Sequence, residues 1–93
     1  MMILKLRKIY KNRPMDNMTF TVFSKKNCSF CDRAINLIED NDHTVIIKKI
    51  DEDQAFFLEM REKAPAMRTM PVVFVDDQLI GGYADLVQHF SNK

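Results

Sequence analysis

The chain contains two cysteines, Cys28 and Cys31, which are separated by two residues in the segment KNCSFCDR. Two cysteines with this spacing could form a redox couple, supply half of a metal site, or be small apolar residues without reactivity. A redox couple would use one thiolate to attack a disulfide and the second thiol to resolve the mixed disulfide. Which chemistry applies depends on the elements that position the two sulfur atoms.

A predicted strand precedes the cysteines, and a predicted helix contains them. The segment TFTVFS at 19–24 is rich in β-branched and aromatic residues, whereas apolar residues in CSFCDRAINLIED recur at helical spacing. Asn27 is the predicted N-cap of this helix. Cys28 therefore lies at a helix start, where unpaired N–H groups and a partial positive charge stabilise a thiolate.

This placement predicts different roles for the two cysteines. Cys28 follows Lys25 and Lys26 and is the predicted nucleophile, the more exposed of the two thiols. Cys31 lies one turn further along the helix and is the predicted resolving thiol, less exposed than Cys28.

The other two kinds of chemistry fit the sequence less well. A closed zinc site needs four ligands, and the chain has one CxxC pair with His43 and His89 remote from it in sequence. Two inert buried cysteines would leave the strand–CxxC–helix placement unexplained. The redox couple is therefore the favoured interpretation.

The rest of the chain alternates between strand and helix patterns. The predicted strands after the first are 44–50, 72–75 and 78–80, and the predicted later helices open at 51–54 and at 83. The order βαβαββα predicts an α/β fold with a four-stranded mixed sheet flanked by three helices. Its first two strands should be parallel and its last two an antiparallel hairpin that turns at Asp76–Asp77.

Composition indicates one domain, at 18–93, with a basic extension at 1–17 that is expected to be dispensable for chemistry. Residues 1–18 carry five basic side chains and one acidic one, whereas the remaining 75 residues carry nine basic and twelve acidic ones. The total charge of +1 predicts no strong attraction to nucleic acid or membranes. Two cysteines are too few for a secreted disulfide scaffold, so a reducing compartment, by default the cytoplasm, is expected, although a basic mitochondrial presequence is an open alternative. The protein is also expected to be a monomer.

Three motifs make residues 19–90 resemble a glutaredoxin, a thioredoxin-like dithiol oxidoreductase. KKNCSFC is similar to the glutaredoxin active site, and RTMP at 68–71 resembles the Thr-x-Pro segment whose proline is cis in this fold. GGYAD at 81–85 resembles the Gly-Gly motif before the last helix. The resemblance implies a glutathione-dependent oxidoreductase that reduces protein disulfides and glutathione mixed disulfides, in electron transport and cell redox homeostasis.

The resemblance also implies a glutathione site. Lys25 and Arg68 would attract the glycine carboxylate, the Met70 backbone would pair with the cysteinyl segment, and the Asp85 carboxylate would bind the γ-glutamyl ammonium. Helix N–H groups at Ala84 and Asp85 would hold the γ-glutamyl carboxylate. The full implied set is Lys25, Phe30, Arg68, Thr69, Met70, Pro71, Gly82, Ala84 and Asp85.

Two departures from the family pattern leave alternatives open. Ser29 and Phe30 stand where many members have Pro and Tyr, and members with Ser there include dimers that hold a [2Fe–2S] cluster through the first cysteine, here Cys28, and glutathione. Ala84 lacks a polar side chain that relatives often have, which should weaken glutathione binding modestly. A third alternative is an electron donor to ribonucleotide reductase, against which Lys25, Arg68 and Asp85 argue, since such a donor does not need a glutathione site.

Overall fold

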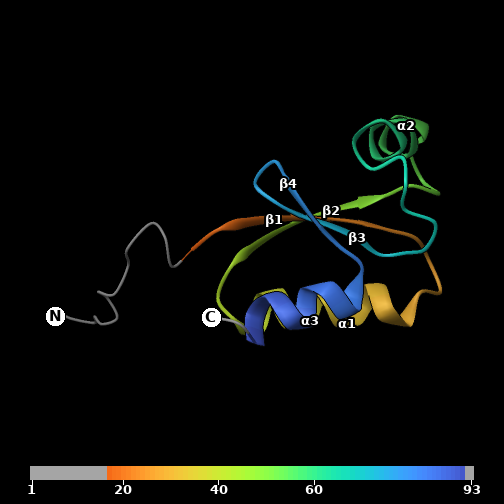
Figure 1. Ribbon diagram of the computed structural model, residues 1–93. Helices are drawn as coiled ribbons and strands as arrows, with labels where there is room; N and C mark the ends of the chain where they lie inside the picture. The colour runs from red at the N-terminus through yellow and green to blue at the C-terminus, as the bar shows by residue number, and fades with distance from the viewer. Residues whose placement is uncertain (1–16, 92–93) are drawn as a thin grey trace, which may run out of the picture.

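The central feature of the computed structural model, which describes residues 17–91, is a sheet covered by helices on both faces (Figure 1). The elements in chain order are β1 (Thr19–Ser24), α1 (Ser29–Asp40), β2 (Thr44–Lys49), α2 (Gln54–Lys63), β3 (Val72–Val75), β4 (Gln78–Gly81) and α3 (Tyr83–Ser91). This βαβαββα order confirms the predicted fold class. The predicted extension at 1–17 lies outside the described residues, apart from Asn17.

The sheet has the strand order β2-β1-β3-β4 and is mixed, as predicted. β1 pairs in parallel with β2 through the crossover helix α1, and it pairs antiparallel with β3. β3 and β4 form the expected antiparallel hairpin, whose turn contains Asp76 at a φ of 51°. The carboxyl end of the central strand β1 therefore leads directly into the loop that carries the cysteines.

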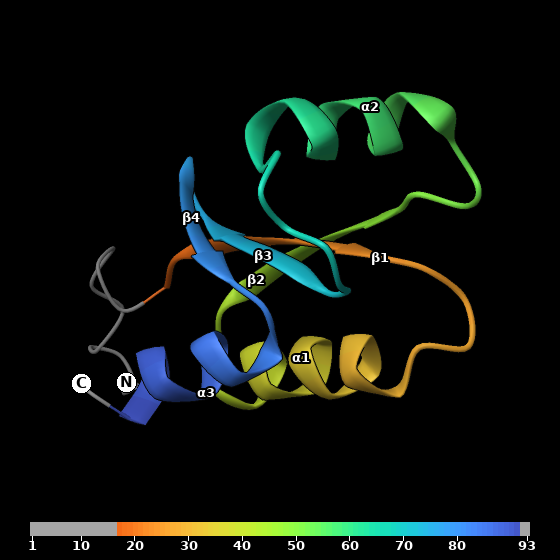
Figure 2. The same ribbon diagram turned by 45° about the vertical axis from the view of Figure 1, so that its right-hand side comes forward.

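Alternation along β1 divides the core between the two faces of the sheet. Phe20 and Val22 are buried against α1 and α3, whereas Phe23 belongs to a second cluster that contains Met60 of α2. Figure 2 shows α1 and α3 side by side beneath the sheet and α2 alone above it. The cysteine-bearing helix thus rests on the larger of the two apolar clusters.

The start of the domain is held by side chains of the α1–β2 turn. The Met18 N–H donates to Nδ1 of His43 at 2.9 Å, and the ring of His43 lies 5.1 Å from that of Phe20. The Thr44 N–H donates to the Met18 carbonyl at 3.0 Å. Met18 is therefore integrated into the described fold.

Helix α2 begins later than predicted. Asp53 is its N-cap and accepts the Ala55 N–H at 2.9 Å, so Asp51 and Glu52 lie in the preceding turn rather than in the helix. Only Met60 of this helix is buried. Its outer face leaves Leu58 56% exposed, so α2 is held by few side chains.

An ion-pair network links α2 to the strand β2. The Lys48 Nζ on β2 donates to both carboxylate oxygens of Glu59 at 2.9 Å, and Lys63 Nζ lies 3.0 Å from Oε2 of the same residue. The hydrogen bond from Lys48 holds the pKa of Glu59 below its usual range, with Lys63 contributing to the same shift. Glu59 in turn raises the pKa of Lys63.

No helix within residues 17–91 is both long and apolar enough to cross a membrane.

Glu59→Gln is expected to lower the free energy of unfolding by about 0.5–1 kcal/mol at pH 7, because two partly exposed ion pairs lose their charge. A carboxyl group with a lowered folded-state pKa stabilises the fold above its ordinary pKa, and this contribution is lost as the pH falls through the folded-state value. The difference between the variant and the wild type should therefore shrink in acid. Urea unfolding at about pH 7 and pH 3 measures it. Glu62→Gln, which changes the same charge on the same helix, is the control, and an equal effect of both variants would contradict the assignment.

Candidate functional site

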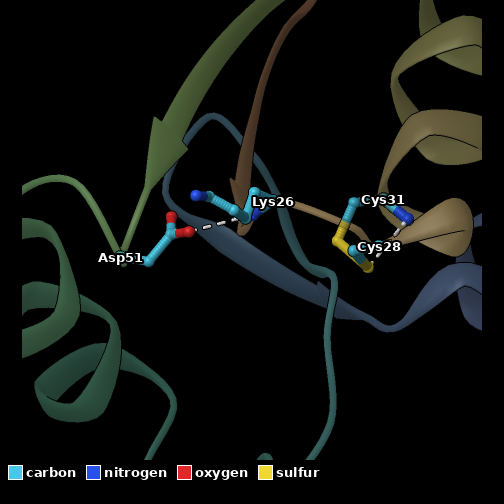
Figure 3. The surroundings of a disulfide bond; sticks show 4 residues. All are labelled: Lys26, Cys28, Cys31 and Asp51. Carbon is cyan, nitrogen blue, oxygen red and sulfur yellow. Dashed lines mark hydrogen bonds between the residues drawn. A yellow bond between two sulfur atoms is a disulfide. The ribbon is translucent and has the colours of Figure 1, made fainter.

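The loop between β1 and α1 places the two cysteines at one end of the sheet. The Lys26 N–H donates to Oδ2 of Asp51 at 3.1 Å, which ties the loop to the β2–α2 connection (Figure 3). One residue later, Asn27 adopts a φ of 59°, a left-handed conformation that Asn tolerates better than most residues. The chain is thereby turned into the first residues of α1.

Cys28, not Asn27, is the N-cap of α1. Its backbone is extended at φ −120°, and its Sγ accepts the N–H of Cys31 at 3.2 Å. The prediction of Asn27 as the cap was therefore wrong by one residue. The cause is that the left-handed turn uses Asn27, so the cap position and its acceptor atom pass to the cysteine.

The two cysteines are joined as a disulfide, with a Cα–Cα distance of 5.2 Å. Cys28 is partly exposed, whereas Cys31 is 1% exposed and belongs to the buried side of α1. This difference confirms the predicted order of exposure. A partner sulfur can therefore approach Cys28 from solvent, while Cys31 is placed to attack only from within the protein.

The segment 68–71 lies near Phe30 of α1 and near the start of α3. The Met70–Pro71 peptide is cis, as the motif implies, and Pro71 is fully buried. A Cβ placed on Gly82 would lie 3.7 Å from the Pro71 carbonyl oxygen, so the loop and the start of α3 approach closely. Three residues that are far apart in sequence thus line the same groove, namely Phe30, Met70 and Gly82.

This surface contains two neighbouring depressions. The first, the apolar groove, has a volume of about 480 Å³ and is lined by Phe30, Met67, Thr69, Met70, Gly82, Tyr83, Ala84 and Asp85. The second, the basic hollow, has a volume of about 320 Å³ and is lined by Lys25, Ile50, Phe57, Met60, Arg61, Met67, Arg68, Thr69, Met70 and Val72. Met67, Thr69 and Met70 belong to both and form the ridge between them.

The structure gathers most of the predicted site residues around these depressions. Six of them line the apolar groove, namely Phe30, Thr69, Met70, Gly82, Ala84 and Asp85. The two predicted cations, Lys25 and Arg68, line the basic hollow. Pro71 is buried and lines neither depression. Neither cysteine is a lining residue, and Phe30, which lies between them in sequence, connects the pair to the apolar groove.

Phe30 and Tyr83 form an aromatic wall of the apolar groove, and only Phe30 was predicted as a site residue. Phe30 is 50% exposed, and its ring centroid lies 5.7 Å from that of Tyr83, with the Arg33 guanidinium 5.4 Å from the Phe30 ring. Tyr83 was missed although it directly follows the Gly-Gly motif. Met67 was missed as well, and its neighbour Arg68 was its only signal in the sequence.

The start of α3 shapes the other end of the groove. The Asp85 Oδ2 atom accepts the Gly82 N–H at 2.9 Å. Gly81 has a φ of 128°, and a Cβ at this position would collide with the Asp85 carboxylate. Glycine at position 81 thus leaves room for the side chain that caps the helix start.

No group of three or more His, Cys, Asp or Glu side chains that could hold a metal ion occurs in the part of the chain that the structure describes.

Comparison with known proteins gives a consistent result. The glutaredoxin family model matches residues 20–80. Mitochondrial glutaredoxin-2 of Bos taurus is 33% identical over 73 residues, which cover 76% of this chain but only 46% of the relative. The structure of reduced Escherichia coli glutaredoxin matches with a TM-score of 0.71 at 27% identity, covering 82% of this chain and 96% of that one. A buckwheat glutaredoxin–glutathione complex matches with a TM-score of 0.64 at 24% identity, covering 81% and 70%.

Gly81→Ala is expected to lower the free energy of unfolding by at least about 2 kcal/mol, since the new Cβ would need a strained φ and would displace the Asp85 carboxylate. Gly82→Ala is the matched control. Its Cβ would meet only ordinary contacts, so its cost should be about 1 kcal/mol or less. Chemical denaturation of both variants checks this order, and an equal loss of stability would contradict the role given to Gly81.

Proposed function

This chain belongs to the glutaredoxin family, and from that premise we propose that it is a glutathione-dependent thiol–disulfide oxidoreductase. The observation that carries the proposal is the bonded cysteine pair, with its partly exposed sulfur at a helix start and its buried sulfur behind it. Cys28 is the proposed nucleophile and Cys31 the proposed resolving thiol.

The helix start supports the role of Cys28. In the reduced protein, the N–H of Cys31 that now points to Sγ of Cys28 would donate to a thiolate at the same place. The partial positive charge at the start of α1 favours the same ionised form. An attacking thiolate is thereby stabilised without a separate base.

Two reactions follow from this arrangement. With a glutathionylated protein, the Cys28 thiolate attacks the glutathione sulfur, and the protein thiolate leaves and takes up a proton. The thiolate of a second glutathione then attacks the Cys28–glutathione disulfide, which releases oxidised glutathione and restores the Cys28 thiolate.

With a protein disulfide, Cys28 forms a mixed disulfide with one substrate sulfur, and the other substrate sulfur leaves as a thiolate and is protonated. The Cys31 thiolate then attacks Cys28, which releases the second substrate thiol and forms the Cys28–Cys31 disulfide. Two glutathione molecules reduce this disulfide and leave as one oxidised glutathione.

The two depressions offer groups that could bind each part of glutathione. The cysteinyl segment would lie along the ridge at Thr69 and Met70, and the γ-glutamyl end would extend to the start of α3. The unpaired N–H groups there would receive its carboxylate, and the second oxygen of Asp85 would receive its ammonium. The glycine carboxylate would turn toward Lys25 and Arg68 in the basic hollow. A buckwheat glutaredoxin that matches this fold was solved as a complex with glutathione, which supports glutathione as the ligand that we propose.

Single cysteine variants test the proposed division of labour. Cys28→Ser should abolish both reactions, whereas Cys31→Ser should keep deglutathionylation and lose reduction of protein disulfides, because only the second reaction needs an internal thiol. The measurement is a glutathione-coupled assay with a glutathionylated peptide and with a peptide disulfide. Loss of both activities in Cys31→Ser would refute the monothiol route. Visible absorption of the purified protein would instead support the [2Fe–2S] dimer.

The cations of the basic hollow can be tested separately. Lys25→Ala and Arg68→Ala should each raise KM for a glutathionylated peptide about two- to five-fold, the value of one exposed charge contact, with the effect shrinking as salt rises. Lys49→Ala, which removes a cation of β2 that lines neither depression, is the control. Unchanged KM values at low salt would remove these two residues from the glutathione site.

A further inference from the structure

The charge of the basic hollow differs from that of the domain around it. Residues 17–91 contain eight basic and twelve acidic side chains, a net charge of −4. Three of the eight basic residues, Lys25, Arg61 and Arg68, line this one depression, and no carboxylate is among its described lining residues. None of the three forms an ion pair with another residue of the range 17–91.

Of the five cations in the range 17–91 that lie outside the hollow, two form ion pairs within that range, whereas Lys26, Arg33 and Lys49 do not. Lys48 and Lys63 both pair with Glu59, and Lys63 lies only two residues from Arg61 on the same helix. The three cations of the basic hollow thus remain available to a ligand that carries negative charge.

Glutathione leaves part of this hollow unused. Its glycine carboxylate is a single anion, and the proposed function already assigns it to Lys25 and Arg68. Arg61 and Phe57 come from adjacent turns of α2, which lies alone on its face of the sheet among the described elements (Figure 2). Phe57 is 40% exposed and, together with Met60, adds an apolar surface to the hollow.

We propose that the basic hollow is the docking site for an acidic polypeptide segment next to the reacting cysteine of a protein substrate. This inference rests on the proposed function and names its substrate class. A substrate strand that occupied the ridge at Thr69 and Met70 would carry its adjacent residues into the hollow, since both residues line the two depressions. An acidic side chain would meet Arg61, and an apolar neighbour would pack on Phe57.

Arg61 is therefore the specificity-determining residue of this site. It lines the hollow without lining the apolar groove, and it is exposed, so its replacement leaves both core clusters intact. Lys63→Ala provides a matched control, because it removes one positive charge from the same helix at a position that lines neither depression.

The test uses two peptides with one internal disulfide each, flanked by glutamates in one and by lysines in the other. The reduced protein is mixed with each peptide in single-turnover reactions without glutathione, and peptide thiols are quantified by chromatography. The wild type should reduce the glutamate peptide faster. Arg61→Ala should lower this preference about three- to ten-fold, a change of about 0.7–1.4 kcal/mol, and Lys63→Ala should leave it within about two-fold, a change of about 0.4 kcal/mol.

Two further measurements separate this inference from the proposed function. The kcat/KM of Arg61→Ala for the mixed disulfide of cysteine and glutathione should stay within about two-fold of the wild type, and the glutamate preference should fall as salt rises. Reduction of both peptides at equal rates, or an unchanged preference in Arg61→Ala, would overturn the docking site alone. Failure of the wild type to reduce either peptide would overturn the protein disulfide reaction as well.

Discussion

The contact on which the site depends is the hydrogen bond between the Cys31 N–H and the sulfur of Cys28. Helix starts leave N–H groups unpaired, and most proteins satisfy one of them with an oxygen of Ser, Thr, Asp or Asn. Here a sulfur occupies that position, so the cap of α1 and the reactive atom are the same. Both the exposure of Cys28 and the burial of Cys31 follow from this geometry, because the cap projects from the helix end while the residue one turn later faces the core.

A second helix start completes the surface. The Asp85 carboxylate caps α3 through the Gly82 N–H, and this contact requires the absence of a side chain at Gly81. The starts of α1 and α3 approach the same groove through Phe30 and Tyr83. Both helix starts carry partial positive charge. They therefore add to the attraction that the cations of this surface exert on an elongated anionic ligand.

Much of this arrangement could be predicted from local patterns. Strand alternation and helical spacing gave the element order, and the cysteine spacing gave the reactive pair, because these depend on residues close in sequence. The cap residue could not be predicted, since the left-handed turn at Asn27 is favoured jointly by Asn27 and by the distant carboxylate of Asp51, which holds the Lys26 N–H. Arg61 and Tyr83 were missed for a similar reason, because only the tertiary fold brings them to the two depressions.

The two faces of the sheet carry different constraints. α1 and α3 pack on a shared cluster around Phe20 and Leu86, so a change in either helix alters the position of the cysteine pair. α2 buries only Met60 and is held by an ion-pair network at the far side of the helix from the basic hollow. Its exposed residues can therefore differ between related chains at little cost in stability. A surface that selects substrates is best built on such an element, because its side chains can change while the geometry of the reacting sulfur atoms stays the same.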